Sequence, residues 1–439
     1  MNKIKNILII GQTTLHWGRM EYGNIGNYYI IEPFIRELHK VFPQAKIKTT
    51  LQMSDDFCKR EKVARLPMEI YYSWDDSNYY METVKELGIA ELYNKTNIIS
   101  HKTPYIKAVL ESDLVIDFSG DIWGDNANFL GENRFIIGLI KDRIAQLLKK
   151  KTVMLAGSPG PFNDNSTLPF AKLVYENFDL VTNREPISTK LLNDLGFNLS
   201  KTKSLACPAF LFEPKTDVNI DYIYKKLSLN NGRKNVGFIL CGWNLLKGPF
   251  NRWPIDDSDL LNYVELIENF ADKNDVNIIL MSHSNGFDLF PDFKLKHGRD
   301  FPFAKKIFDI LRKRNKINLD KIKLQTELLD AWATKKFIGN LDMLISGRIH
   351  GAVAGMSQYI PTVIIDYGHE PKAHKLLGFA EVAGMSDFIV DPKEKDVLKD
   401  KVDFCFQNLD EIKKMLKNRM PKVKSMAKDN FRLLINLCK

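Results

Sequence analysis

Residues 342–355 read DMLISGRIHGAVAG. The apolar run 342–345 predicts a strand, and the small and apolar residues that follow Ile349 predict a helix. Glycines stand on either side of Arg348 and His350 at the junction. A strand that turns directly into a helix is the unit of a parallel sheet covered by helices, so this stretch indicates an α/β fold.

The same alternation of short apolar runs and helical periodicity extends over most of the chain. Candidate strands occupy residues 7–11, 45–51, 113–119, 152–157, 179–182, 235–242, 276–282, 342–346 and 362–366. Candidate helices occupy residues 27–41, 102–111, 134–150, 168–177, 186–195, 259–273, 301–314, 326–339, 349–358 and 371–378. The aromatic-rich segment 52–80 reads as an irregular insertion at the sheet edge or over a site. The pattern predicts two Rossmann-like, doubly wound domains that face a cleft.

Length also favours two domains, because a chain of 439 residues exceeds the size of one ordinary core. Residues 213–234 combine proline, charge and an Asn-Asn-Gly turn, which is typical of a connection. We therefore predict an N-terminal domain over 1–213, a linker over 214–234 and a C-terminal domain over 235–392. Residues 393–439 are predicted to form helices that pack back on the first domain.

Composition limits the protein class. Apolar residues make up 44% and charged residues 27%, as in a globular protein, and the net charge is +9. This charge suits acidic small molecules, a phospholipid surface or nucleic acid. Five scattered cysteines without CxxC spacing argue against disulfides and zinc and predict a reducing cytoplasm. The first apolar run is too short for a signal peptide, and no run reaches the length of a membrane span.

Arg348 and His350 are the strongest site candidates. A helix N-terminus is already partly positive, so two more cations there are unfavourable unless an anion binds. Arginine suits phosphate or carboxylate, and histidine can donate and accept a proton near neutral pH. The stretch therefore predicts an anion cradle, with a histidine satisfied by backbone groups as the alternative. Lys372 follows the next strand and is either a phosphate partner or a solvated lysine.

His369, Glu370 and His374 resemble a zinc-protease motif only superficially. That motif needs its second histidine at position 373, which is alanine, and Pro371 breaks the helical register. We predict no metal site.

In the first half, Gly23 and Gly26 open a helix, either as a ligand loop or as a flexible turn with a cap. Asp121, Trp123 and Asp125 follow the strand at 113–119 in a glycine-rich segment. They are candidates for sugar contacts, and turn formation is the commoner role of such acids. Arg184 lies just before a helix that begins with Pro186 and is a further candidate site residue. The alternative role for Arg184 is an ordinary surface ion pair.

Several blocks resemble the polysaccharide pyruvyl transferase family, in the right order over residues 20–390. GNIGN (23–27), DLVIDFSGDIWGDN (113–126), AGSPGPF (156–162) and VTNREPISTKLLNDLGF (181–197) are similar to its earlier blocks. SGRIHGAVAGMSQYIPTVIIDYGHEPKAHKLLGF (346–379) resembles its C-terminal signature and is the specific part.

The resemblance implies a glycosyltransferase-B-like fold and transfer of pyruvate from phosphoenolpyruvate to a sugar as a ketal. Arg184, Arg348 and Lys372 would bind the donor, and His350 would protonate its methylene carbon. Acceptor contacts would come from the first domain, through Gly26, Asn27, Asp121, Trp123 and Asp125. No cofactor or metal is expected. Cys207, Asn27 and Ser119-Gly120-Asp121 depart from the family pattern and leave the Arg-x-His block unchanged.

Two other functions remain open. A nucleotide-sugar glycosyltransferase of the same fold would bind a nucleotide sugar instead of phosphoenolpyruvate, and a non-catalytic relative would only bind sugar or anion. The acceptor is either a cell-surface polymer or its lipid-linked precursor. The basic segment 305–316 would then be a membrane-facing patch, unless it is a solvated helix face. No basic stripe of a recognised module supports nucleic-acid binding.

Overall fold

The computed structural model describes residues 4–13, 18–74, 76–248, 250, 253–288, 294–369 and 373–438. The chain divides into two compact units. Unit 1 contains Met1–Met20, Glu32–Pro208 and Met426–Lys439, and unit 2 contains Glu21–Ile31 and Ala209–Ser425. Two α/β units with parallel sheets confirm the predicted fold class.

Unit 1 is built on a seven-stranded sheet of order β3-β2-β1-β4-β5-β6-β7, in which every pair of neighbours is parallel. The strands are β1 (Asn6–Ile10), β2 (Lys46–Thr49), β3 (Val63–Arg65), β4 (Leu114–Asp117), β5 (Lys151–Gly157), β6 (Leu180–Asn183) and β7 (Thr202–Ser204). β1, β4 and β6 are almost wholly buried, as expected for strands covered on both faces.

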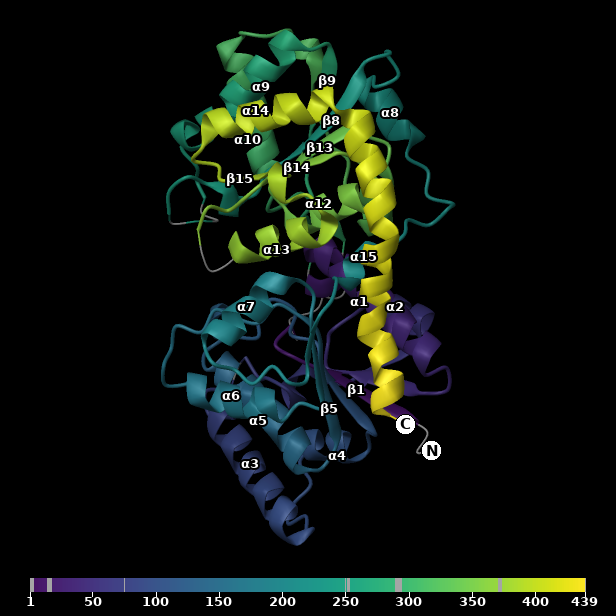
Figure 1. Ribbon diagram of the computed structural model, residues 1–439, viewed down its shortest axis with the longest axis vertical. Helices are drawn as coiled ribbons and strands as arrows, with labels where there is room; N and C mark the ends of the chain where they lie inside the picture. The colour runs from purple at the N-terminus through teal and green to yellow at the C-terminus, as the bar shows by residue number, and fades with distance from the viewer. Residues whose placement is uncertain are drawn as a thin grey trace. The chain divides into compact units, whose positions relative to one another are not determined.

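The helices that follow these strands are α1 (Ile25–Val41), α2 (Asp55–Glu61), α3 (Tyr79–Thr96), α4 (Pro104–Leu110), α5 (Arg134–Leu147), α6 (Leu168–Glu176) and α7 (Pro186–Asp194). The division between the two units falls inside the continuous helix α1, between Ile31 and Glu32. Figure 1 shows α3 beside α5 at the end of unit 1, and these two helices are in contact.

The segment 52–80 is more regular than predicted. Ser54 accepts a hydrogen bond from the backbone N–H of Phe57 and so starts α2, and Lys62 ends α2 in the left-handed conformation. β3 then pairs with β2 at the edge of the sheet. The predicted place at the sheet edge is therefore confirmed for β3, and the predicted irregularity is wrong for α2 and β3.

Unit 2 contains a second parallel sheet of order β12-β9-β8-β13-β14-β15. Its strands are β8 (Lys234–Ile239), β9 (Val276–Leu280), β12 (Ile322–Leu324), β13 (Met343–Ser346), β14 (Thr362–Ile365) and β15 (Ile389–Val390). β10 (Gly286–Phe287) and β11 (Leu295–Lys296) form a small antiparallel pair. In Figure 1, β8, β13 and β14 lie together in the middle of this unit.

The helices of unit 2 are α8 (Asp221–Leu227), α9 (Leu261–Lys273), α10 (Phe301–Arg314), α11 (Ala331–Ile338), α12 (Ile349–Met356), α13 (Ala373–Ala383), α14 (Lys395–Gln407) and most of α15 (Leu409–Leu437). The predicted linker 214–234 lies inside unit 2 and contains α8, and the division falls at Pro208 instead of residue 213. The first part of α1, as far as Ile31, also belongs to unit 2.

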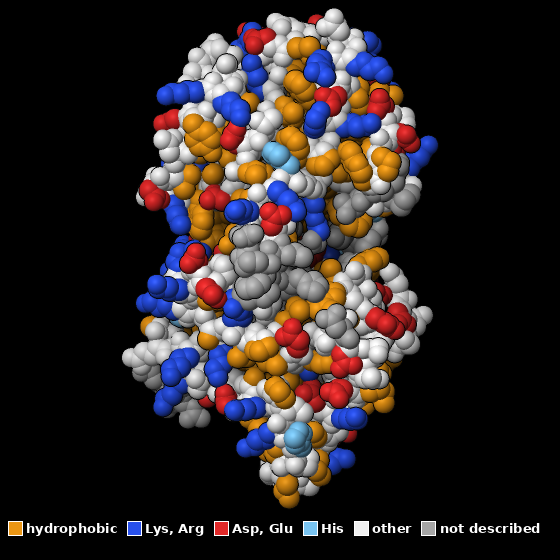
Figure 2. Space-filling view, turned by 180° about the vertical axis from the view of Figure 1, so that it is seen from behind, with side chains coloured by type: hydrophobic (Ala, Val, Ile, Leu, Met, Phe, Trp, Pro, Cys, Tyr) orange, Lys and Arg blue, Asp and Glu red, His pale blue; other side chains and the backbone are white. Residues whose placement is uncertain are grey.

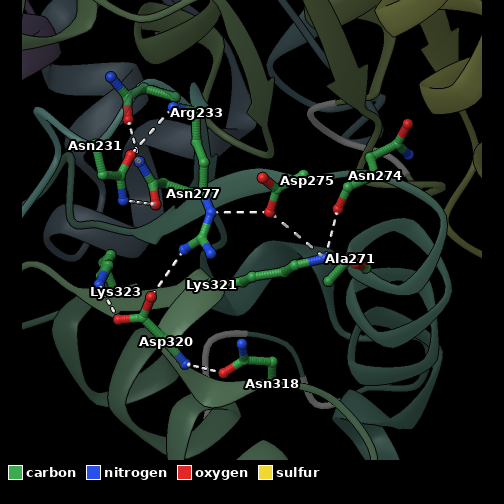
Figure 3. Close-up of polar contacts among 11 residues, drawn as sticks. Asn231, Arg233, Ala271, Asn274, Asp275, Asn277, Asn318, Asp320, Lys321 and Lys323 are labelled. Carbon is green, nitrogen blue, oxygen red and sulfur yellow. Dashed lines mark hydrogen bonds and ion pairs between the residues drawn. The ribbon is translucent and has the colours of Figure 1, made fainter.

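A polar network joins the amino ends of β8, β9 and β12 (Figure 3). Arg233 bridges Asp275 and Asp320, with nitrogen–oxygen distances of 2.8 Å to each. Asn231 and Asn277 exchange hydrogen bonds of 3.0 Å. Because ligands of such sheets bind at the carboxyl ends of the strands, this network serves to hold the opposite edge together.

The basic segment 305–316 lies mostly on α10, where several of its cations are paired. Lys305 contacts Asp309, Lys306 contacts Asp257, and Arg314 forms a two-pronged ion pair with Glu268. On the face shown in Figure 2, basic and acidic side chains occur side by side over most of the surface. The pairing favours a solvated helix face over a membrane patch. Within the described ranges, no helix is long and apolar enough to cross a bilayer.

Candidate functional site

The carboxyl ends of four neighbouring strands define the ligand-binding edge of unit 2. β13 lies between β8 and β14, and β9 pairs with the other side of β8. Arg348 and His350 follow β13, His283 follows β9, Trp243 follows β8 and His369 follows β14. All four loops are therefore at the edge where parallel sheets bind their ligands.

Arg348 stands immediately before α12 and is 9% exposed. Its guanidinium binds Asp300, with Nε 3.1 Å from each carboxylate oxygen and Nη2 also donating to Oδ1. Burial lowers the pKa of Arg348, but the charges of Asp300 and Cys241 and the Asp300 hydrogen bonds outweigh it, so the pKa lies above its ordinary value. The anion that the sequence demanded at this helix start is thus supplied internally. An anion cradle that uses both Arg348 and His350 stays a prediction.

His350 lies in the first turn of α12 and is 8% exposed. Its ring meets Phe379 of α13 edge-on, with 5.8 Å between the ring centres. Gly26, in the first turn of α1, lies against the other side: a Cβ added there would be 2.5 Å from Nδ1 of His350. The close approach predicted for Gly26 is therefore made to the histidine. In this structure Gly26 positions His350.

His283 was missed by the sequence analysis and lies beside His350. It is fully buried and meets Tyr29 edge-on at 5.3 Å between ring centres. Tyr29 and Gly26 are three residues apart on α1 and so share one helix face, which brings the two histidines close. Neither ring nitrogen of His283 has a hydrogen-bond partner among the residues that the structure describes. Burial, and then the charges of His350 and Arg348, lower the pKa of His283 well below its ordinary value.

Asp300 and Arg299 are further residues that the motifs did not reveal. Asp300 is fully buried just before α10 and also accepts a 3.1 Å hydrogen bond from the backbone N–H of His283. Arg299 is exposed as a whole residue, but its guanidinium is partly enclosed by neighbouring groups. This partial burial, and then the nearby charge of Arg348, lower the pKa of Arg299. Together these residues place two arginines and two histidines at the strand ends of unit 2.

Asn244 ties three of these loops together. Its Nδ2 donates to the carbonyl oxygens of Ile365 and Asp366, both at 3.2 Å, and its Oδ1 accepts from the backbone N–H of Cys241 at 3.0 Å. A Cβ on Gly347 would lie 2.1 Å from the same Oδ1. The glycine before Arg348 is therefore required by Asn244, which fixes the loops after β8, β13 and β14 relative to each other.

Lys372 lies outside the described residues, so its predicted donor role stays a prediction. In the part of the chain that the structure describes, no group of three or more histidine, cysteine or acidic side chains could hold a metal ion. The expectation of a metal-free, cofactor-free reaction likewise stays a prediction.

In unit 1, the strand ends gather Arg184, Ser158 and Asp121. Arg184 is 3% exposed, and its Nε donates to the hydroxyl of Ser158 at 2.9 Å. Its Nη2 lies 4.0 Å from Asp121. Arg184 is thus held inward by the loops after β4 and β5, and its predicted donor contact is untested. Asn27 lies in the first turn of α1, in unit 2, and not among these unit 1 residues.

Trp123 does not offer its ring to a sugar. It is fully buried among Phe135, Phe162, Tyr175 and Phe178, and its Nε1 donates to Asp142. A ring enclosed on all sides fills the core, so the predicted stacking role is corrected to a packing role.

Asp125 forms a turn, as acids in glycine-rich loops commonly do. Its Oδ2 accepts hydrogen bonds from the backbone N–H groups of Asn163 and Asp164, the latter at 3.0 Å. Turn formation therefore describes Asp125 better than a sugar contact does. Asp121 is the acid of this segment that contacts Arg184.

The comparisons with known proteins agree with this architecture. Residues 24–369 match the family model described as polysaccharide pyruvyl transferase. A glycosyltransferase from Rickettsia africae is 15% identical, with 100% of this chain and 98% of that chain covered and a TM-score of 0.57. No curated protein sequence matched the chain.

Two UDP-GlcNAc 2-epimerases have similar structures. That of Neisseria meningitidis is 12% identical over 99% of this chain and 100% of its own, with a TM-score of 0.58. That of Methanocaldococcus jannaschii is 15% identical over 99% of each chain, with a TM-score of 0.51. Identities this low show the two-unit, glycosyltransferase-B-like fold and nothing about the reaction.

Proposed function

Because its match spans residues 24–369, the chain belongs to the polysaccharide pyruvyl transferase family, and from this premise we propose that phosphoenolpyruvate is its pyruvyl donor. The acceptor is a sugar of a surface polysaccharide or of its lipid-linked precursor, and the products are a pyruvate ketal and phosphate. The observation that carries this proposal is the placement of Arg348 and His350 at the start of α12, on the ligand-binding edge of unit 2.

In the proposed reaction, His350 is the proton donor. His350 protonates the methylene carbon of phosphoenolpyruvate, and C2 becomes an oxocarbenium-like electrophile. A sugar hydroxyl attacks C2 and its proton returns to His350. Phosphate then leaves with the C2–O bond electrons, and a second hydroxyl closes the ketal while its proton leaves with phosphate.

The charges at this edge support a donor with phosphate and carboxylate groups. Asp300 neutralises much of Arg348, so Arg348 acts as a rigid, oriented group, and Arg299 is the more exposed cation beside it. The backbone N–H groups at the start of α12 add favourable partial charge. Arg184 in unit 1 and Lys372 are the other proposed donor ligands. Electrostatic stabilisation of the departing phosphate would supply much of the rate enhancement.

Titration calorimetry tests the donor. We expect phosphoenolpyruvate to bind the wild-type chain and UDP-GlcNAc not to bind. Arg299→Ala should weaken the binding of phosphoenolpyruvate about tenfold or more, because it removes a hydrogen bond to a charged group. Arg233→Ala is the matched control, because it removes an arginine at the opposite edge of the same sheet and should leave binding unchanged. Binding of UDP-GlcNAc without phosphoenolpyruvate would instead identify a nucleotide-sugar glycosyltransferase.

A second measurement separates binding from chemistry. His350→Asn should retain phosphoenolpyruvate binding within about threefold while acceptor-dependent phosphate release falls by about 100-fold or more, the range of general acid catalysis. Near-normal phosphate release in this variant would remove His350 from the mechanism.

A further inference from the structure

Four aromatic rings line the loops on both sides of the Arg-x-His turn. Trp243 and Phe250 follow β8, and Tyr367 and His369 follow β14. The rings of His369 and Phe250 are stacked with 3.4 Å between their centres and 6° between their planes. Trp243 lies 28° from the plane of Phe250 and 33° from that of His369. The rings are thus nearly parallel, and we refer to Trp243, Phe250 and His369 as the aromatic wall.

The aromatic wall is fixed in place. Nε2 of His369 donates to the carbonyl oxygen of Trp243 at 3.1 Å. Asn244, the neighbour of Trp243, binds the end of β14 and contacts Gly347. The loops that carry the wall are therefore tied, through Asn244, to the turn before Arg348.

The exposure of these rings differs from that of the core aromatics of the chain. Trp123 is fully buried within a cluster of rings. By contrast, Trp243, Phe250 and His369 are each only half-buried, although they are large rings in a loop region. Packing alone does not explain half-exposed, parallel rings that flank the cations of a ligand-binding edge.

We propose that the aromatic wall is the subsite for the acceptor sugar, whose apolar C–H face lies against the rings. This inference rests on the proposed function, because phosphoenolpyruvate is a small, highly charged molecule without a ring and has no use for an aromatic surface. The reaction requires two sugar hydroxyls close to C2 of the donor, and the wall comes from the loops after β8 and β14, the two strands that flank β13 and the turn that carries Arg348 and His350. Unit 2 then contributes to acceptor binding, which the sequence placed in the first domain.

Saturation-transfer NMR tests the subsite with methyl glycosides of glucose, galactose, mannose and N-acetylglucosamine, with and without phosphoenolpyruvate. We expect at least one glycoside to bind the wild-type chain through its ring protons. Trp243→Ala and His369→Ala should each weaken the binding of that glycoside about tenfold. Neither variant should change the binding of phosphoenolpyruvate, as measured by calorimetry. Trp253→Ala is the matched control, because Trp253 is 60% exposed and packs on Phe303 instead of the wall.

Three outcomes would overturn the proposal. Glycoside binding could be unaffected in both wall variants, or no glycoside could bind the wild-type chain. Alternatively, uridine could bind the wild type and lose affinity in Trp243→Ala, which would assign the wall to a nucleobase. Thermal unfolding of each variant checks folding. If the wild-type chain does not bind phosphoenolpyruvate, the proposed donor is wrong. The glycoside measurements would still decide whether the aromatic wall binds a sugar.

Discussion

Gly26 has no room for a side chain, because the imidazole of His350 occupies the space where a Cβ would stand. A similar constraint acts on Gly347, which faces the amide of Asn244. Glycines in a ligand loop are usually explained by the approach of a substrate to the backbone. Here they let protein side chains approach, so the loops gain a fixed histidine and a fixed turn.

Gly26→Ala therefore tests whether the orientation of His350 matters. The new methyl group must displace His350, and we expect acceptor-dependent turnover to fall about 100-fold, as for a misplacement of about 1 Å at a catalytic group. Overpacking against His350 costs about 1–3 kcal/mol, and the helix propensity of alanine offsets about 1 kcal/mol of this, so the free energy of unfolding should fall by no more than about 2 kcal/mol.

Gly88→Ala is the matched control. It lies in α3, and an added Cβ would have nothing within 4 Å. This variant should retain full turnover, and equal losses in both variants would contradict a specific role for Gly26.

At the residue scale, the sequence correctly predicted the turn from β13 into α12, because that motif is local. Arg348 and His350 lie two positions apart, so the turn that holds them could be recognised. Their partners Asp300, His283 and Asn244 come from other loops, and no short spacing announces them. Trp123 was misjudged because a glycine-rich segment resembles a ligand loop whether its tryptophan faces solvent or the core.

At the level of elements, α5 and β4 carry a pair of buried acids. Asp117 ends β4 and accepts hydrogen bonds from the backbone N–H and hydroxyl of Ser119. Burial, against these hydrogen bonds, raises the pKa of Asp117 to about 7. Burial and then the charge of Asp117 raise the pKa of Asp142 well above its ordinary value. Both pKa values are raised by folding, so the folded state favours the protonated acids.

This pair predicts a pH-dependent loss of stability. The stabilisation is complete below the ordinary pKa of an acid, about 4, and is lost as the pH rises through about 7. Asp142→Asn keeps an acceptor for Trp123 and removes one charge, so it should raise the melting temperature at pH 8 by several degrees and much less at pH 5. Asp272→Asn, on the exposed face of α9, should show no such difference. An equal effect of Asp142→Asn at both pH values would show that the pair does not titrate.

The sequence located most central strands because both of their faces are buried, which produces short apolar runs. It missed the edge strands β3, β7, β12 and β15, which are only two or three residues long. It also missed α3, whose buried residues are Thr83, Glu86 and Ala90. Their spacing is helical, but their chemistry is not that of an apolar stripe, so hydrophobic periodicity could not reveal it.

At the scale of the whole molecule, each unit is assembled from separate parts of the chain. The sequence predicted that residues 393–439 return to the first domain, which is confirmed for the last of them, but it gave no sign that a segment near the amino end belongs to unit 2. Residues Glu21–Ile31 join unit 2, and Met426–Lys439 join unit 1. The returning end of α15 is anchored in unit 1 by Asn430, which is fully buried. Asn430 accepts from Thr182 at 2.6 Å and donates to the carbonyl oxygen of Ala206 at 2.9 Å.

Asn430→Ala should destabilise unit 1 by about 1–3 kcal/mol, because it leaves the buried hydroxyl of Thr182 and the carbonyl of Ala206 without this partner. Limited proteolysis with mapping of the fragments would detect faster cleavage within residues 32–208. Asn269→Ala is the control, since its exposed amide donates only to the carbonyl oxygen of Glu265 on its own helix. Unchanged cleavage in the Asn430 variant would mean that the end of α15 does not support unit 1.

The return of α15 also has a consequence for biosynthesis. A ribosome delivers the seven strands of unit 1 early, yet the α15 residues that complete the unit leave the ribosome only after nearly all of unit 2. Domains made of one continuous segment can fold in the order in which they are translated. This chain has to hold unit 1 incomplete until residues 426–439 have been made, so a premature stop codon before them would damage the part of the protein that was made first.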